Sequence, residues 1–119
     1  MLKILFVTQD ADLRAVVPRA LRPVGWQVTT VAHAGHAVLA CMARERPDFD
    51  VLIVEDPMAD AGSIALGERL RRYCPRLQVV RLCDAGAGSA GEGTAVVRPF
   101  TADSLIGAVL LAASAIRAA

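Results

Sequence analysis

VLIVEDPM, residues 51–58, is the stretch of sequence that decides the fold prediction. Its first four residues are apolar without interruption, which is typical of a strand covered on both faces of a parallel sheet. Glu55 and Asp56 follow at once, so the strand would carry two carboxyl groups at its C-terminal end. That end of a parallel sheet is where binding sites lie. The stretch therefore predicts a buried central strand that leads into a functional edge.

Strands and helices are predicted to alternate on both sides of this stretch. Short apolar runs indicate further strands at 3–7, 26–31, 77–82 and 95–97. Apolar residues at helical spacing indicate helices at about 10–24, 34–46 and 63–73, and Thr101 is expected to cap a last helix. Pro18 is expected to weaken the first helix and Pro23 to end it. The alternation predicts right-handed βαβ crossovers, and hence a parallel sheet with helices on both faces.

The composition predicts a single cytoplasmic domain over residues 1–119. Of the 119 residues, 55% are hydrophobic and 21% are charged, which allows a core of its own. A net charge of +1 gives no field that would attract nucleic acid. The longest apolar tract, 105–116, is shorter than the ~20 residues of a membrane span. Three irregularly spaced cysteines make no disulfide framework, which fits a reducing cytosol. Because nearly all the basic residues are Arg, we expect a bacterial source.

The segments TQD (8–10), ED (55–56) and RPF (98–100) each follow a predicted strand, and in this order they resemble a response-regulator receiver domain of two-component signalling. KILFV followed by TQD (3–10) is similar to the family's first strand and the acidic cluster after it. The segment 25–54 resembles the next two units, and RPF (98–100) stands where the family has Lys-Pro-Phe. The resemblance covers the whole chain. It implies a flavodoxin-like (βα)5 fold, an α/β class with a five-stranded, doubly wound parallel sheet.

The resemblance also implies a phosphorylation site, from which this sequence departs at nearly every position. Receivers hold Mg²⁺ with acids after the first strand and with the phosphoacceptor Asp that ends the third. Thr8 and Gln9 stand in place of the acidic pair, which leaves Asp10 on its outer side. Glu55 stands at the acceptor position. The other substituted positions are Cys83 for the family's Thr or Ser, Arg98 for its Lys and Ala95 for its aromatic switch residue.

These departures predict a receiver whose phosphotransfer site is degenerate. Neutral oxygens at Thr8 and Gln9 supply no charge, so we expect no Mg²⁺ binding and no other cofactor. The longer carboxylate of Glu55 and the planar guanidinium of Arg98 are suited to bidentate pairing. Such a pair would either imitate the phosphorylated state or only neutralise what remains of the site. Asp56 is a poor substitute acceptor, because side chains alternate in direction along a strand.

Two other constellations favour ordinary structural roles. His33, His36 and Cys41 contain metal-ligating groups, but the two histidines fall at a helix start and Cys41 falls on a packing position. The sequence therefore favours exposed histidines over a metal site. Cys83 could be redox-active beside a cation such as Arg98. A small buried hydrophobic side chain is the favoured interpretation.

One surface is predicted to bind a protein. Residues 84–94 contain four glycines and are too short for the family's fourth helix and its loops, so that helix is expected to be missing or rudimentary. The last helix is apolar nearly all round and should not stay bare in water. A protein partner, a second copy or the glycine-rich loop would cover it. The residues expected on this face of strand four, strand five and the last helix are Ala95, Leu105, Ile106, Val109 and Leu111.

The sequence thus predicts a non-enzymatic signalling or interaction module that works in a phosphorelay context without being phosphorylated. One alternative is a receiver phosphorylated at a non-standard acceptor, Glu55 or Asp56. A second is a module that binds a small ligand in the old crevice. A third is that the chain is one domain of a larger regulator.

Overall fold

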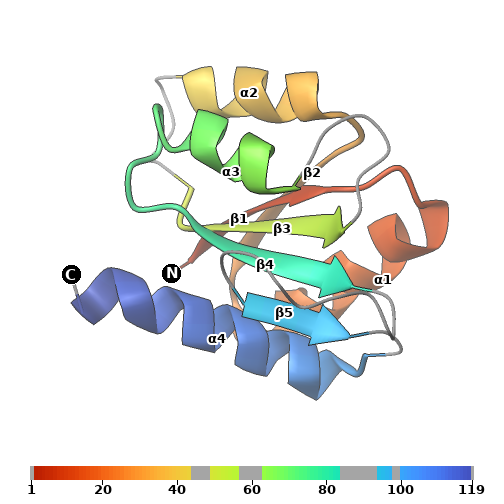
Figure 1. Ribbon diagram of the computed structural model, residues 1–119. Helices are drawn as coiled ribbons and strands as arrows, with labels where there is room; N and C mark the ends of the chain where they lie inside the picture. The colour runs from red at the N-terminus through yellow and green to blue at the C-terminus, as the bar shows by residue number, and fades with distance from the viewer. Residues whose placement is uncertain (1, 44–48, 57–62, 84–93, 98–99, 119) are drawn as a thin grey trace.

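The computed structural model describes residues 2–43, 49–56, 63–83, 94–97 and 100–118. Five strands form one sheet with helices in two layers (Figure 1). The strands are β1 (Lys3–Val7), β2 (Gln27–Val31), β3 (Val51–Asp56), β4 (Gln78–Cys83) and β5 (Thr94–Val97). The helices are α1 (Ala11–Leu21), α2 (Ala34–Met42), α3 (Ser63–Leu70) and α4 (Ala102–Ala118), and a 3₁₀ helix, Arg22–Val24, follows α1.

The sheet is parallel throughout, with the strand order β2-β1-β3-β4-β5. The apolar run VLIV (51–54) therefore lies in the central strand, as predicted. Helices α2 and α3 cover one face, and α1 and α4 cover the other (Figure 1). From β1 the chain first adds β2 on one side, and it then adds β3, β4 and β5 on the other side. This change in strand order makes the C-terminal ends of β1 and β3 a topological switch point. The predicted fold class is confirmed.

The core consists of two apolar layers, one on each side of the sheet. Alternate residues of β1 enter different layers: Ile4 and Phe6 pack on the side of α1 and α4, and Leu5 and Val7 pack on the side of α2 and α3. Both sets are fully buried, because both faces of the sheet are covered. This double coverage explains why the strand sequences are continuous apolar runs with no polar alternation.

Three local devices fix the ends and the packing of the helices. Gly25 ends the 3₁₀ helix in the left-handed region at φ 88°, where residues with a Cβ are strained. Gly67 lets α3 approach the sheet closely, since a Cβ there would lie 3.0 Å from Val79 Cγ2. Thr101 caps α4 as predicted, because its Oγ1 accepts from the backbone N–H of Ser104 (3.1 Å). The hydroxyl of Ser104 accepts in turn from the backbone N–H of Thr101 (2.9 Å).

The structure differs from the predicted elements mainly at helix ends. Helix α3 stops at Leu70 and not at Tyr73, whose backbone N–H bonds to the carbonyl of Leu70 (3.0 Å) in a tighter turn. The fourth helix of the structure, α4, is the C-terminal one. The prediction of a missing or rudimentary helix between β4 and β5 concerns residues 84–93, which lie outside the described residues. Among the described helices, none combines the length and apolar character that crossing a membrane requires.

Candidate functional site at the carboxyl edge of the sheet

The register of the strands brings most of the predicted site positions to one edge. Val7 pairs with Val54, so Thr8 and Glu55 each follow one member of that pair. Asp56 pairs with Cys83, and Cys83 pairs with Val97. The strand-end site, as we call Thr8–Asp10, Glu55, Asp56 and Cys83, is therefore a single contiguous edge. Arg98 comes next after Val97 in the sequence and lies outside the described residues.

Thr8 serves to connect β1 to α1. It is buried, with 1% of its surface exposed, and its backbone N–H donates to the carbonyl of Val31 (3.0 Å). Its Oγ1 accepts from the backbone N–H of Asp10 (3.0 Å), and Arg14 Nη2 donates to its backbone carbonyl (3.4 Å). The hydroxyl thus satisfies a backbone group in a turn, as short polar side chains commonly do.

Asp10, the one acid after β1, is the N-cap of α1. Its Oδ1 accepts from the backbone N–H groups of Asp12 (2.8 Å) and Leu13 (3.2 Å). A capping carboxylate satisfies helix donors that have no partner within the helix, and its charge interacts favourably with the helix dipole. One of the two oxygens of this carboxylate is therefore committed to the helix.

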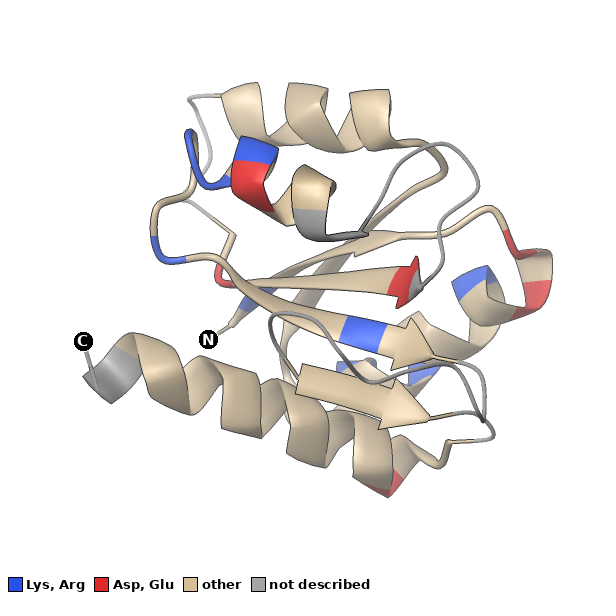
Figure 2. Cartoon of the chain, viewed as in Figure 1, with Lys and Arg blue, Asp and Glu red and all other residues tan. Residues whose placement is uncertain are grey.

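Glu55 is half-buried at the end of β3, beside Leu82 of β4. Figure 2 shows acidic residues, in red, at the tip of β3 and around the start of α1, besides others elsewhere in the fold. The side chain of Asp56 and all of Arg98 lie outside what the structure describes. The Glu55–Arg98 pairing and the role of Asp56 as an acceptor consequently stay predictions.

Cys83 is buried, as expected, with 2% of its surface exposed. Its Sγ accepts from Arg81 Nη1 (3.9 Å) and lies 3.8 Å from the backbone carbonyl of Arg81, to which the thiol donates. These are long, weak contacts of the kind that sulfur makes. Within the described part of the chain, the cation beside the thiol is Arg81, two residues earlier on the same strand.

Arg81 is a feature of the site that the sequence prediction missed. It is 1% exposed and is the largest fully buried side chain among the described residues. It pairs with Val54 on one side and with Ala95 on the other (blue on β4 in Figure 2). The available signal was a single charge inside the apolar run LQVVRL (77–82). A charged group in such a place is costly to bury, so its retention indicates partners for the guanidinium.

Gln9 points away from the acidic positions, toward α2. Its Nε2 donates to Nδ1 of His33 (3.1 Å), and the rings of His33 and His36 meet edge to face with their centroids 5.3 Å apart. Both histidines are exposed, as predicted. Cys41 is half-buried farther along α2. Among the described residues, no group of three or more His, Cys, Asp or Glu side chains is arranged to hold a metal ion.

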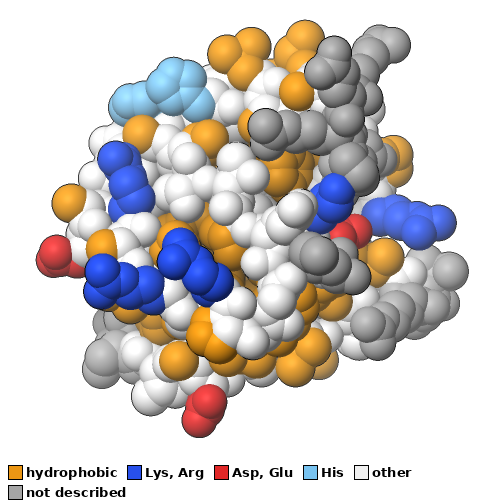
Figure 3. Space-filling model, turned by 180° about the vertical axis from the view of Figure 1, so that it is seen from behind, with side chains coloured by type: hydrophobic (Ala, Val, Ile, Leu, Met, Phe, Trp, Pro, Cys, Tyr) orange, Lys and Arg blue, Asp and Glu red, His pale blue; other side chains and the backbone are white. Residues whose placement is uncertain are grey.

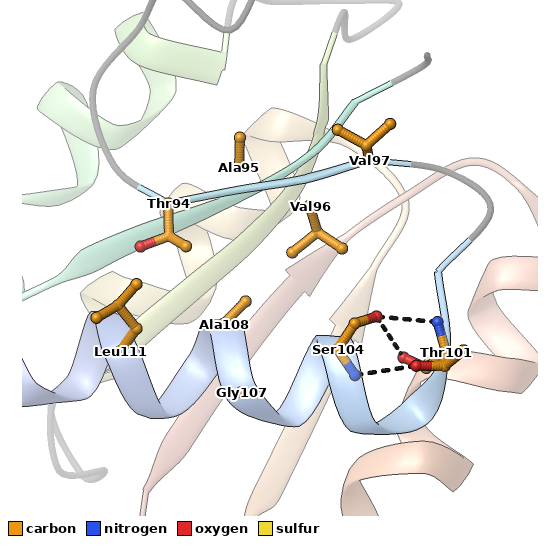
Figure 4. A pocket seen from close by; sticks show the side chains of 9 residues that line it. All are labelled: Thr94, Ala95, Val96, Val97, Thr101, Ser104, Gly107, Ala108 and Leu111. Carbon is orange, nitrogen blue, oxygen red and sulfur yellow. Dashed lines mark hydrogen bonds between the residues drawn. The ribbon is translucent and has the colours of Figure 1, made fainter.

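The predicted interaction face contains a groove between β5 and α4 (Figure 4). Its volume is about 470 Å³. Leu111 is 63% exposed at its rim, and Ala95 lies half-buried on the strand side. The residues that line the groove are Thr94, Ala95, Val96, Val97, Thr101, Ser104, Gly107, Ala108 and Leu111.

The structure corrects two members of that face. Leu105 and Val109 are completely buried and belong to the core beneath α4, so they offer no surface to a partner. Ile106 is partly buried against the same core. A helix that is apolar all round does not reveal from its sequence alone which side faces the sheet. Of the predicted residues on α4, Leu111 is the one that is exposed.

Known proteins resemble the chain both in sequence and in structure. The chain matches no protein-family model. It is 34% identical over 110 residues to the "Probable transcriptional regulatory protein TcrX" of Mycobacterium tuberculosis. That match covers 87% of the chain and 46% of the relative, so the chain spans less than half of the relative's length.

Solved structures with the same fold include response regulator receiver domains. The response regulator receiver domain protein from Clostridium thermocellum matches with a TM-score of 0.80 at 19% identity, over 99% of this chain and 98% of that one. NtrX from Brucella abortus matches with a TM-score of 0.80 at 25% identity, over 99% of this chain and 28% of that one. The resemblance noted in the sequence is therefore confirmed, and the chain has the fold of a response-regulator receiver domain.

Proposed function

We propose that this chain is a degenerate receiver, a cytoplasmic, non-enzymatic module of a two-component phosphorelay that acts through protein contacts and is not switched by phosphorylation. The observation that carries the proposal is that the residues after β1 make structural hydrogen bonds within the chain. Thr8 and Gln9 are neutral, and the single carboxylate among the three residues, Asp10, caps α1 with Oδ1. A receiver needs that edge for a metal-bound phosphoryl group.

The side chains available as ligands at the strand-end site support the absence of a receiver-type Mg²⁺ site. Mg²⁺ prefers carboxylate oxygens in near-ideal octahedral geometry, and it neutralises the oxygens of a phosphoryl group in transfer. Here the hydroxyl of Thr8 is buried in a turn and the amide of Gln9 bonds to His33. Glu55 places its carboxylate one methylene farther from β3 than Asp would. Each of these substitutions weakens a different part of the phosphotransfer chemistry.

Incubation with acetyl phosphate and Mg²⁺ is expected to leave the mass of the chain unchanged. Intact-mass spectrometry measures this directly and covers every acceptor at once, including Glu55 and Asp56. Addition of one phosphoryl group to the wild-type chain would overturn the proposal.

A variant with the family's acids restored provides the matched control. Thr8→Asp, Gln9→Asp and Glu55→Asp together return the carboxylates that a receiver uses, and we expect this variant to gain a phosphoryl group in the same assay. Because Thr8 is buried, the variant must first be shown to be folded by circular dichroism. A folded variant that stays unlabelled would mean that residues beyond these three, such as Cys83, also limit the chemistry.

The surface proposed for protein contacts is the β5–α4 groove, with a second copy of the chain as its occupant. Gly107 is one of the residues that line the groove, and a Cβ there would meet nothing within 4 Å, while Leu111 stands exposed at the rim. None of the described residues that line the groove is charged, so two copies would meet without like-charge repulsion. A twofold contact needs a self-complementary patch, and a protruding Leu beside a hollow at Gly meets that need.

Leu111→Asp is expected to convert a dimer into a monomer, because it puts a carboxylate in place of the exposed apolar side chain proposed to enter the partner's groove. Leu39→Asp is the matched control, since Leu39 is 64% exposed and lies on α2, on the other face of the sheet. Light scattering at ~100 μM, far above typical specific dissociation constants, measures the mass. A monomeric wild type, or an equal effect of both substitutions, would rule out self-association through this groove.

A further inference from the structure

We propose that the outer edge of β2 (Gln27–Val31) binds an extended, acidic segment of a protein partner as a further strand of the sheet. Acidic side chains of that segment pair with Arg14 of α1 and with Arg22, which follows α1. Strand β2 lies at one end of the sheet and β5 at the other, so this edge is separate from the β5–α4 groove. The proposal does not rest on the proposed function.

Backbone groups on the outer edge of β2 have no hydrogen-bond partner within the described part of the chain. The N–H of Gln27 donates to the carbonyl of Leu2 (3.1 Å), and the register with β1 continues from there without a break. In a parallel pair every second residue bonds to a given neighbour, so Gln27 and the residues two and four positions later bond to β1. The N–H and C=O groups of Val28 and Thr30 face outward. No bond joins these groups to any described residue.

The sequence of β2 lacks the features that usually protect an edge strand. Proteins block such edges with charged side chains, prolines or bulges. The strand reads QVTTV, without a charge or a proline, and its five consecutive pairs with β1 contain no bulge. All its residues except the first are β-branched, which suits an extended backbone. The edge can therefore hydrogen-bond to an added strand without rearranging.

Two arginines place positive charge beside this edge. Arg14 and Arg22 are both exposed, and they lie eight positions apart, a spacing that puts side chains on one side of a helix. Nη2 of Arg14 donates to the carbonyl of Thr8 (3.4 Å), whose N–H bonds to Val31 of β2, so this side of α1 borders the strand. Figure 3 looks at the molecule from the side of β2, and several Lys and Arg side chains gather on that face.

The spacing of the two arginines sets the sequence pattern of the partner. Eight helical residues span about 12 Å, and four residues of a strand span about 13 Å. Acidic residues four positions apart on an extended segment lie on one face and match both guanidinium groups. On the other face of β2, helix α2 (Ala34–Met42) carries no Lys, Arg, Asp or Glu. The partner's intervening side chains on that face are therefore apolar.

Charge argues against a second copy of this chain as the occupant. A twofold axis that joined two β2 edges would keep both α1 helices on the same face of the extended sheet. Arg14 and Arg22 of one copy would then face those of the other, and β2 contains no acidic residue to offset the repulsion. The chemistry of the edge thus selects a partner of opposite charge.

The test uses an end-blocked, fluorescently labelled peptide, Thr-Glu-Val-Thr-Val-Glu-Thr, titrated with the full chain and followed by anisotropy. We expect a dissociation constant of about 100 μM. A peptide of the same composition, Thr-Glu-Val-Thr-Glu-Val-Thr, places its two acids on opposite faces and is expected to bind at least about tenfold more weakly. Absence of binding up to about 1 mM, or equal binding of the two peptides, would overturn the proposal.

Substitutions separate the backbone contribution from the charges. Thr30→Pro removes an outward N–H, which an edge strand tolerates, and is expected to weaken binding at least about tenfold with an unchanged circular dichroism spectrum. Arg14→Gln with Arg22→Gln is expected to weaken binding about tenfold, and it decides the matter if Thr30→Pro does not fold. Arg69→Gln with Arg72→Gln is the matched control, which removes the same charge at the end of α3 and is expected to change nothing. An equal loss in that control would mean general charge attraction and would refute the site.

Amide hydrogen exchange locates the bound segment independently of affinity. The amides of Val28 and Thr30 are expected to exchange more slowly when the acidic peptide is present, because their N–H groups become hydrogen-bonded. Protection confined to other strands would contradict the assignment. Light scattering tests the competing occupant, since Thr30→Pro is expected to leave the mass of the chain unchanged. A lower mass in Thr30→Pro would show that a second copy occupies the edge, and the proposal of an acidic partner would fall.

Discussion

Leu105→Ala is expected to lower the free energy of unfolding by about 3 kcal/mol, the middle of the range measured for buried Leu. Leu105 is completely buried and packs in the layer that contains Phe6, Leu82 and Val109. The substitution removes apolar contacts and leaves a cavity that neighbouring strands cannot fill without distortion. Urea unfolding followed by circular dichroism measures the loss.

Leu111→Ala is the control for this measurement, since Leu111 lies on the same helix and is 63% exposed. Its substitution is expected to change the free energy of unfolding by less than about 0.5 kcal/mol. The measurement belongs at low protein concentration, where a dimer would be dissociated. Equal losses in the two variants would contradict the orientation of α4 and return Leu105 to the surface, where the sequence pattern had placed it.

The strands were predictable from the sequence because both faces of the sheet are covered. A run such as VLIV (51–54) contains no polar residue that an exposed face would require, and it leads directly to Glu55. Helix ends were less predictable. The apolar spacing continues to Tyr73, whereas α3 stops at Leu70, because a bond from the N–H of Tyr73 tightens the turn. Such a bond leaves no mark on hydrophobic periodicity.

The strand-end site could be located from the sequence, but the use of its side chains could not. Parallel strands bring their C-terminal ends together, which places Thr8, Glu55 and Cys83 at one edge from the pattern alone. Gln9 is directed toward His33 by a contact between residues that are 24 positions apart in the sequence. Neither a glutamine nor a histidine at these positions predicts such a contact. Likewise, α4 has no polar face in its sequence. A polar face would have marked the exposed side of the helix, and so the opposite side, with Leu105, as buried.

Arg81→Ala is expected to lower the free energy of unfolding by about 2–5 kcal/mol, the range for truncating a large buried side chain to Ala. Arg81 is 1% exposed in the middle of β4, between Val54 and Ala95. Its removal leaves a cavity the size of a long side chain. It also removes the hydrogen-bond donor of the groups that the guanidinium contacts. Thermal and urea unfolding both measure the loss.

Arg81→Met separates the two causes of that loss. The thioether side chain of Met fills much of the same volume but donates no hydrogen bond. The free energy of unfolding of Arg81→Met is therefore expected to lie between that of the wild type and that of Arg81→Ala. Recovery of full stability by Met would mean that Arg81 acts by packing alone. No recovery would mean that the guanidinium's contacts account for the whole effect. Surface substitutions typically change the free energy of unfolding by less than about 0.5 kcal/mol. A loss that small in Arg81→Ala would contradict the burial of Arg81, because removal of a long buried side chain costs more.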